Sequence, residues 1–136
     1  MPILTFHGTG DPILKFNGGI GGDALAHALS GAPPSPTTTV PADLNGPGFP
    51  ATVLAWAEKD GCQKTPTDRK VSEHVIHRVY HCPTGVAVEF YIVLGGGHSW
   101  PGSEFSKAIE SLVGPTTFEI NATEAIWKFF QRYQLT

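Results

Sequence analysis

Apolar residues along this chain fall into short runs that have the lengths of strands and helices. Two runs rich in β-forming residues, 3–6 and 86–94, predict strands. The second run is apolar apart from Glu89, a pattern typical of a strand buried on both faces. Glycines follow both runs closely, so we expect a loop at the carboxyl end of each strand.

Three segments in the second part of the chain carry helical signals. Pro50 suits the first turn of a helix, and Gly61 is placed to end it. A short helix is expected at about 105–113. The last helix is expected to begin at the capping arrangement of Asn121 and Glu124, and aromatic residues give it an apolar face.

The whole chain, residues 1–136, is expected to form part or all of one domain. Residues 30–48 are rich in proline and threonine, which excludes a helix there and leaves little to bury. We interpret this segment as an insertion, because neither flank alone could build a core. The chain opens directly on a strand pattern, which is typical of a segment that starts within a fold.

Charge and hydropathy exclude two classes of partner. The net charge of −3 and the pI near 6.0 give no basic field for nucleic acid. No apolar run approaches the roughly 20 residues that span a bilayer. The first residues also lack the basic region of a signal peptide. We therefore expect neither a nucleic-acid partner nor a membrane partner.

The chain contains two cysteines, Cys62 and Cys82, without the spacing of a zinc or thioredoxin-like motif. As a disulfide they would stabilise the fold by about 3 kcal/mol in the loop-entropy model, and would indicate an exported protein. The alternative is a pair of unrelated buried thiols. The disulfide is the favoured interpretation.

Three histidines, His74, His77 and His81, invite a metal-site interpretation, but their neighbours are β-branched or aromatic and favour a strand. On a strand His74 faces away from the other two, which lie about 13 Å apart at roughly 3.3 Å per residue. We therefore expect no metal site here.

Candidate chemistry lies in the two loops that follow the predicted strands. His98 follows three glycines, which leave the backbone open to close approach. Asp11 precedes Pro12, which holds it extended at the end of the first strand. Because carboxyl ends of strands in open α/β sheets gather their functional loops, we expect Asp11 and His98 to form a hydrogen bond. The alternative is that both are ordinary turn residues.

A glycine-rich segment, 19–24, fits the loose fingerprint of dinucleotide sites, and Asp43 lies at about the expected offset. The second strand that such a βαβ unit requires is replaced by prolines and threonines. A dinucleotide-binding half-domain is thus a weak alternative, and we expect no cofactor.

Several motifs occur together: His-Gly-Thr-Gly-Asp-Pro at 7–12, Phe-Asn-Gly-Gly at 16–19, Trp-Ala at 56–57 before Cys62, Gly-Gly-Gly-His-Ser-Trp-Pro-Gly at 95–102, and Ile-Trp-Lys-Phe-Phe at 126–130. This combination resembles the C-terminal half of secreted polyhydroxybutyrate depolymerases and feruloyl-esterase-like proteins of the α/β-hydrolase fold. The resemblance implies that Asp11 is the triad acid and His98 the general base, with Trp100 and Asn17 as substrate-cleft candidates. It also favours the disulfide and a secreted or periplasmic location.

The chain departs from this family at the nucleophile. α/β-Hydrolases place a Gly-x-Ser-x-Gly elbow before the acid, and no serine precedes Asp11. We therefore expect the C-terminal portion of an α/β-hydrolase sheet with flanking helices, incomplete at its N-terminus. Half a parallel sheet would leave an open edge and an uncovered apolar face. The nucleophile, the oxyanion-hole donors and any signal peptide would lie in the missing N-terminal half.

The resemblance implies a carboxylic ester hydrolase that acts on polyhydroxyalkanoates or on feruloyl or acetyl-xylan esters. The chain alone is expected to be inactive, because it carries two of the three triad residues. The alternative function is a noncatalytic secreted binding or structural module on a hydrolase scaffold.

Overall fold

A computed structural model describes residues 1–22, 26, 29–31 and 41–133. Over these residues the fold is mixed α/β, with a four-stranded sheet and four helices. The elements in chain order are β1 (Ile3–Gly8), α2 (Phe49–Lys59), β2 (Thr67–Ser72), β3 (Val75–Tyr80), β4 (Val88–Val93), α3 (Glu104–Ala108), α4 (Glu110–Val113) and α5 (Ala122–Gln131). The two strands predicted from apolar runs are β1 and β4.

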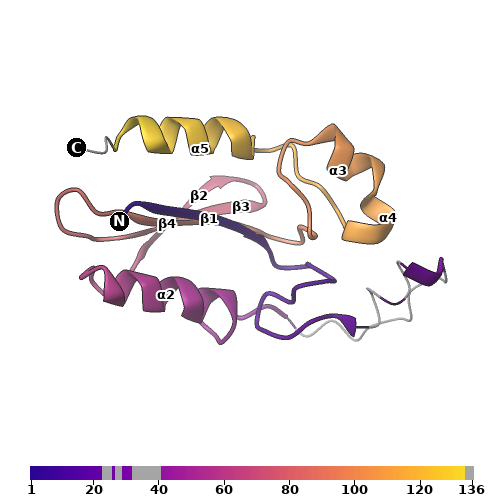
Figure 1. Ribbon diagram of the computed structural model, residues 1–136, viewed down its shortest axis with the longest axis horizontal. Coiled ribbons are helices and arrows are strands. Elements are labelled where there is room, and N and C mark those ends of the chain that lie inside the picture. The colour runs from indigo at the N-terminus through magenta and orange to yellow at the C-terminus, as the bar shows by residue number, and fades with distance from the viewer. Residues whose placement is uncertain (23–25, 27–28, 32–40, 134–136) are drawn as a thin grey trace.

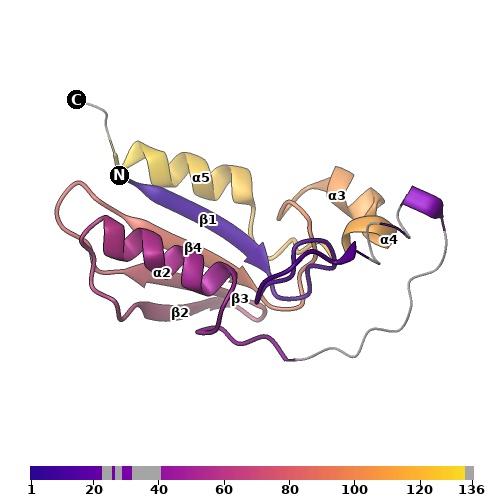
Figure 2. The ribbon, with the colours of Figure 1, turned by 60° about the horizontal axis from the view of Figure 1, so that its bottom comes forward.

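The strand order in the sheet is β1-β4-β3-β2. β1 runs parallel to β4, from Ile3 opposite Val88 to Gly8 opposite Val93. The pairs β4–β3 and β3–β2 are antiparallel. The expectation of half a parallel sheet was wrong, because a hairpin occupies half of the sheet. The parallel pair still brings the carboxyl ends of β1 and β4 to one edge, as Figure 2 shows.

Helices cover both faces of the sheet, with α5 on one side and α2 on the other (Figure 1). Val53 and Ala57 of α2 are buried in one core cluster with Phe90 of β4. Phe129 of α5 is buried as well. The expectation of an uncovered apolar face was therefore wrong. The prediction that β4 is buried on both faces is confirmed, since five of its six residues are buried.

The hairpin β2–β3 was not expected as such, because β2 reads Thr-Asp-Arg-Lys-Val-Ser and has no buried residue. Charged side chains are a common feature of edge strands, where they oppose pairing with another chain. The helix expected at 105–113 is two short helices, α3 and α4, separated at Ile109. The last helix begins as predicted, since the Asn121 side chain accepts a hydrogen bond from the amide of Glu124.

Cys62 and Cys82 form a disulfide, which confirms the favoured prediction. The bond joins the segment after α2 to the segment after β3, beside a backbone hydrogen bond from Gln63 to His81. A disulfide is compatible with an extracellular protein. Within the described part of the chain, no helix has the length and apolar character needed to cross a membrane.

The residues around the insertion are partly described. The short run of residues 13–16, which precedes the glycine-rich segment 19–24, makes a single bridge between Leu14 and Ile20 and is not a strand of the sheet. A βαβ unit that begins with this run is therefore not formed. The end of the dinucleotide fingerprint, residues 23–24, and residues 32–40 of the proline-rich segment 30–48 lie outside the described residues.

Candidate functional site

The loops that follow β1 and β4 pack against each other backbone to backbone. A Cβ atom on Gly8 would lie 2.1 Å from the carbonyl oxygen of Gly96, and one on Gly97 would lie 2.2 Å from that of Val113. Real Cβ atoms do not approach so closely, so glycine is the residue that fits at both positions. The amide of Gly10 also donates to the carbonyl of Gly96. Gly8 therefore allows the contact between the two loops, and Gly97 allows the His98 loop to pack against the end of α4.

Asp11 is held in place by the backbone that follows it. Its Oδ1 accepts hydrogen bonds from the amides of Ile13 and Leu14, at 2.8 and 2.9 Å. Pro12 has no amide hydrogen, so the carboxylate reaches past it to the next two amides. The side chain is 1% exposed. One carboxylate oxygen is thus committed to its own loop, and Oδ2 faces the neighbouring loop.

His98 is held by the segment around α4. Its amide donates to the carbonyl of Val113 at 2.6 Å, and the amide of Gly97 donates to the carbonyl of Pro115 at 2.8 Å. Gly95 adopts a positive φ of 73°, a conformation that glycine takes without strain. The three glycines therefore turn the chain out of β4 and present the imidazole at the end of the sheet.

His98 Nδ1 and Asp11 Oδ2 lie 2.9 Å apart, across 87 residues of sequence. This confirms the predicted hydrogen bond. Because a carboxylate only accepts, Nδ1 carries the hydrogen and the neutral ring has a bare Nε2. Among the described residues no group hydrogen bonds to that Nε2. The His98 side chain is 42% exposed, so Nε2 belongs to a ring that solvent and ligands reach.

A second histidine, His7, lies beside this pair and was not identified from the sequence. It is buried, and its Nε2 is 2.9 Å from the carbonyl of Leu14 and 3.6 Å from Oδ2 of Asp11. Its ring stacks on Phe49 with the centroids 3.6 Å apart. Burial lowers the pKa of His7, although the Leu14 carbonyl and the Asp11 charge act in the opposite direction.

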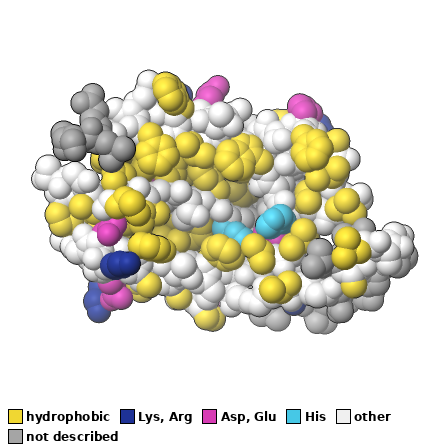
Figure 3. All heavy atoms as spheres, in the orientation of Figure 1, with side chains coloured by type: hydrophobic (Ala, Val, Ile, Leu, Met, Phe, Trp, Pro, Cys, Tyr) yellow, Lys and Arg dark blue, Asp and Glu magenta, His cyan; other side chains and the backbone are white. Residues whose placement is uncertain are grey.

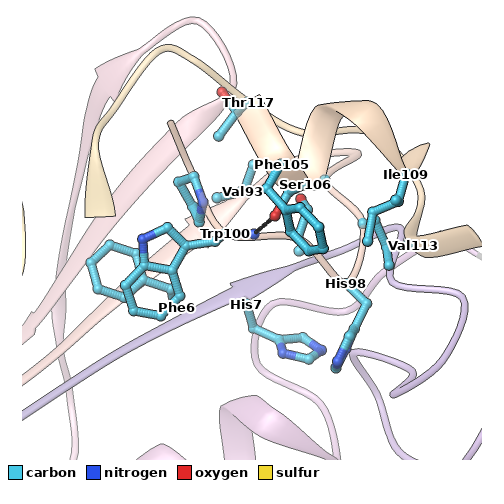
Figure 4. Close-up of a pocket in the computed structure, with 15 residues that line it drawn as sticks. Phe6, His7, Val93, His98, Trp100, Phe105, Ser106, Ile109, Val113 and Thr117 are labelled. Atoms are coloured by element: carbon cyan, nitrogen blue, oxygen red, sulfur yellow. Dashed lines mark hydrogen bonds between the residues drawn. The ribbon is translucent and has the colours of Figure 1, made fainter. Parts of the chain in front are cut away.

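A pocket of about 460 Å³ opens beside the two imidazoles. Its walls are mainly apolar and come from β1, β4, the loop after β4 and the α3–α4 segment: Phe6, Val93, Trp100, Pro101, Phe105, Ile109 and Val113. Figure 3 shows histidine side chains in a hollow of this face, with hydrophobic side chains around it. Figure 4 shows the rings of His7 and His98 next to each other below the apolar side chains.

Trp100, one of the two predicted cleft residues, lines this pocket. Its indole Nε1 donates to Thr123 Oγ1 at 3.1 Å, and its amide donates to Ser106 Oγ at 3.0 Å (Figure 4). The Thr123 hydrogen bond orients the ring, and Trp100 is 49% exposed. Trp100 therefore offers an ordered aromatic surface at the pocket.

Asn17, the other predicted cleft residue, is not among the residues that line the pocket. Its amide nitrogen donates to the carbonyls of Asp43 and Pro47, and its oxygen accepts from the amide of Asp43. The side chain has thus used its hydrogen-bonding groups to hold the segment that leads into α2.

The two serines that line the pocket are both engaged away from His98. Ser99 Oγ donates to the carbonyl of Pro115 at 2.9 Å. Ser106 Oγ accepts from the amide of Trp100 and is buried. Neither hydroxyl forms a hydrogen bond with the imidazole. Among the residues that the structure describes, no serine hydroxyl therefore forms a hydrogen bond with the His98 ring.

The other three histidines that the structure describes each have a separate partner: His74 bonds Glu119, His77 bonds Glu89 and His81 bonds Thr67. The structure therefore does not bring the three together. In the described ranges, no group of three or more histidine, cysteine or acidic side chains is arranged to hold a metal ion.

A second cavity, of about 480 Å³, lies between α5 and the sheet. Glu89 at its base is buried, and its two oxygens meet His77 at 2.7 Å and Arg132 at 2.8 Å. Burial tends to raise the pKa of Glu89, but the hydrogen bond from His77 and the charge of Arg132 outweigh burial and hold the pKa below its ordinary value. This network connects the end of α5 to the sheet.

The chain matches no protein-family model, no curated protein and no solved structure.

Proposed function

We propose that this chain carries the acid and the base of a serine carboxylic ester hydrolase. The observation that carries the proposal is the 2.9 Å hydrogen bond between buried Asp11 and half-exposed His98. Asp11 fixes the His98 tautomer whose bare Nε2 accepts a proton from a hydroxyl. The neighbouring pocket has mainly apolar walls, which favours a substrate with an apolar group over an entirely polar one.

In the proposed reaction His98 Nε2 removes the hydroxyl proton of a serine as the serine oxygen attacks the ester carbonyl carbon. The imidazolium then gives that proton to the departing alcohol oxygen, which leaves an acyl-serine. A water molecule repeats the sequence, losing a proton to His98 and releasing the acid, and the serine regains its hydrogen. Asp11 stays ionised and stabilises the imidazolium in both halves.

In our proposal the nucleophilic serine lies outside the described residues. Ser99 and Ser106 line the pocket, but their hydroxyls bond other groups. In the α/β-hydrolases that the sequence resembles, the nucleophile precedes the acid in the chain. We therefore place the nucleophile elbow upstream of Asp11 in the complete polypeptide, together with the oxyanion-hole donors.

The substrate class follows from the resemblance and the pocket together. The family likeness suggests polyhydroxyalkanoate, feruloyl or acetyl-xylan esters, and the apolar walls around Trp100 and Phe105 suit an aliphatic or aromatic acyl group. The disulfide supports an exported enzyme, secreted or periplasmic.

A fluorophosphonate probe tests the proposal, because it labels a serine only where a base activates the hydroxyl. The isolated chain is expected to remain unlabelled and to hydrolyse no p-nitrophenyl ester above background. The polypeptide expressed with the coding sequence upstream of Met1 is expected to be labelled on one serine in a Gly-x-Ser-x-Gly segment. Labelling of a serine within residues 1–136, or an upstream frame without such a segment, would contradict the proposal.

A noncatalytic binding module is the second candidate. It is favoured by the lack of any described hydroxyl on His98 Nε2 and by the exposure of Trp127 and Phe130 on α5. A longer polypeptide that binds polyester film but is not labelled by the probe would select this candidate. Labelling together with ester hydrolysis would eliminate it.

A further inference from the structure

His7 makes contacts that a buried core histidine does not require. Its Nε2 lies 2.9 Å from the carbonyl oxygen of Leu14, and the Leu14 amide donates a hydrogen bond to Asp11 Oδ1 at 2.9 Å. His7 and Asp11 therefore hold Leu14 from its two backbone groups. The imidazole lies flat against Phe49, which limits its rotation.

The tautomer of His7 follows from its acceptor. A carbonyl oxygen only accepts hydrogen bonds, so Nε2 carries the hydrogen and Nδ1 of the neutral ring is bare. The titratable groups that face His7 are Asp11 and His98. Burial is the largest influence on the pKa of His7 and lowers it, so at neutral pH the ring is an uncharged donor. A neutral His7 does not compensate the negative charge of Asp11, so that charge interacts with His98.

We propose that His7 is a positioning residue of the site: it holds the Asp11–Leu14 turn so that Oδ1 stays bound to the loop and Oδ2 stays aimed at His98. The role in ester hydrolysis rests on the proposed function, whereas the positioning of Asp11 does not. His7 contacts no reacting atom in this arrangement. It acts through Leu14 and Asp11 on the tautomer of His98.

The alternative is a histidine that only fills space between the sheet and α2. A space-filling ring would be replaced by phenylalanine without effect on His98, because phenylalanine keeps the stacking on Phe49. A positioning donor would be replaced by glutamine, whose amide nitrogen also donates to a carbonyl. The two substitutions therefore separate the two roles.

The first measurement uses the unaltered chain labelled with ¹⁵N, whose imidazole shifts report the tautomer and charge of each histidine. His7 is expected in the Nε2–H form and His98 in the Nδ1–H form at neutral pH. As the pH falls, His7 is expected to stay neutral below the usual range of histidine. A His7 ring in the Nδ1–H form, or one that protonates in that usual range, would overturn the proposal.

The second measurement compares His7→Gln and His7→Phe. Asp11→Ala is the reference variant, because it removes the carboxylate that accepts the hydrogen bond from His98 Nδ1. His7→Gln is expected to keep the Nδ1–H signal of His98, and His7→Phe is expected to lose it as Asp11→Ala does. A folded His7→Phe chain that keeps this signal would overturn the proposal. If His7→Phe does not fold, the spectrum of the unaltered chain decides.

These spectra distinguish the positioning role from the proposed reaction. They require neither a nucleophile nor turnover. An absence of esterase activity in the longer polypeptide, together with the expected spectra, would remove the proposed function and leave the positioning of Asp11 established.

Discussion

The segments around the site pack closely because glycines leave room for the neighbouring atoms: Gly8 faces the backbone of the His98 loop, and Gly97 faces the backbone at the end of α4. Gly8, Gly96 and Gly97 each have heavy atoms within 2.7 Å of the place where a Cβ would be. For Gly8 and Gly97 these atoms include backbone carbonyl groups, which cannot move aside as a flexible side chain can. The geometry of Asp11 and His98 thus depends on residues that carry no chemistry themselves.

Gly97→Ala is the sharpest test of this dependence. The added methyl group would lie 2.2 Å from the carbonyl oxygen of Val113, so the His98 loop must shift. We expect the free energy of unfolding to fall by about 1–3 kcal/mol, as for an overpacked site, and the Nδ1–H signal of His98 to be lost. Denaturant titration and ¹⁵N spectra measure both effects.

Gly22→Ala is the matched control, because an added Cβ there meets nothing within 4 Å and the backbone φ is not positive. It should leave both the free energy of unfolding and the His98 signal unchanged. Equal effects of the two substitutions would show that the loop contact does not control the site.

The sequence allowed Asp11 and His98 to be predicted because both follow apolar strands and stand next to glycine or proline, which are strong local signals. His7 stands in the motif at 7–12 but was not predicted as a site residue, since its contact with Leu14 depends on how the loop folds back and no local pattern shows that. Asn17 was assigned to the cleft from the motif alone. Its side chain bonds a segment 26 to 30 residues away, which no local pattern indicates.

At the scale of elements, α5 is attached to the sheet through a charged network as well as through Phe129. Glu89 of β4 bonds His77 of β3 and Arg132, the C-cap residue of α5. A carboxylate buried to this degree is stable only while both partners compensate for its lost hydration. The end of α5 should therefore respond to the charge of Glu89.

Because the folded state lowers the pKa of Glu89, this carboxylate contributes stability above its ordinary pKa of 4.5. That contribution is lost as the pH falls below 4.5 and through the lower pKa of the folded state. Glu89→Gln should reduce the free energy of unfolding at neutral pH by about 2 kcal/mol and flatten this acid dependence. Denaturant titrations between pH 3 and pH 7 measure both.

Glu73→Gln is the control for this measurement, since the Glu73 side chain is 82% exposed. It should retain the acid dependence of the unaltered chain. A Glu89→Gln variant with the same pH profile as the unaltered chain would show that the network does not hold α5.

The β2–β3 hairpin was not predicted from the sequence. β3 was recognised as a strand from its β-branched and aromatic residues, but β2 has neither an apolar face nor a buried residue. Its place at the sheet edge follows from pairing with β3, a tertiary contact that a local pattern does not contain.

At the scale of the whole molecule, the parallel pairing of β1 with β4 brings together two loops that are 87 residues apart. The sequence predicted that these two strands lie in one sheet, and their pairing is what places Asp11 and His98 together. The antiparallel half of the sheet was not expected, because only the apolar strands were visible in the sequence. In the described residues β1 pairs with β4 alone, so its other edge is open.

An open edge strand and exposed aromatic residues favour association between copies of the chain. Trp127 and Phe130 of α5 are 68% and 50% exposed. We expect the isolated chain to form dimers or larger species in sedimentation experiments, and the double substitution Trp127→Gln and Phe130→Gln to shift them toward the monomer. A monodisperse monomer with a sharp two-state melt would contradict this expectation.

In the proposed reaction Asp11 and His98 act as the acid and the base of an ester hydrolase. The most direct measurement is the turnover of a p-nitrophenyl ester by the polypeptide that includes the upstream coding sequence, compared with its Asp11→Asn variant and, as control, Asp43→Asn in an exposed loop. Asp11→Asn should retain the fold and lose about 10⁴-fold in turnover, the size of the loss when a serine protease loses this carboxylate, while Asp43→Asn stays active. Full turnover by Asp11→Asn, or by His98→Ala, would contradict the claim.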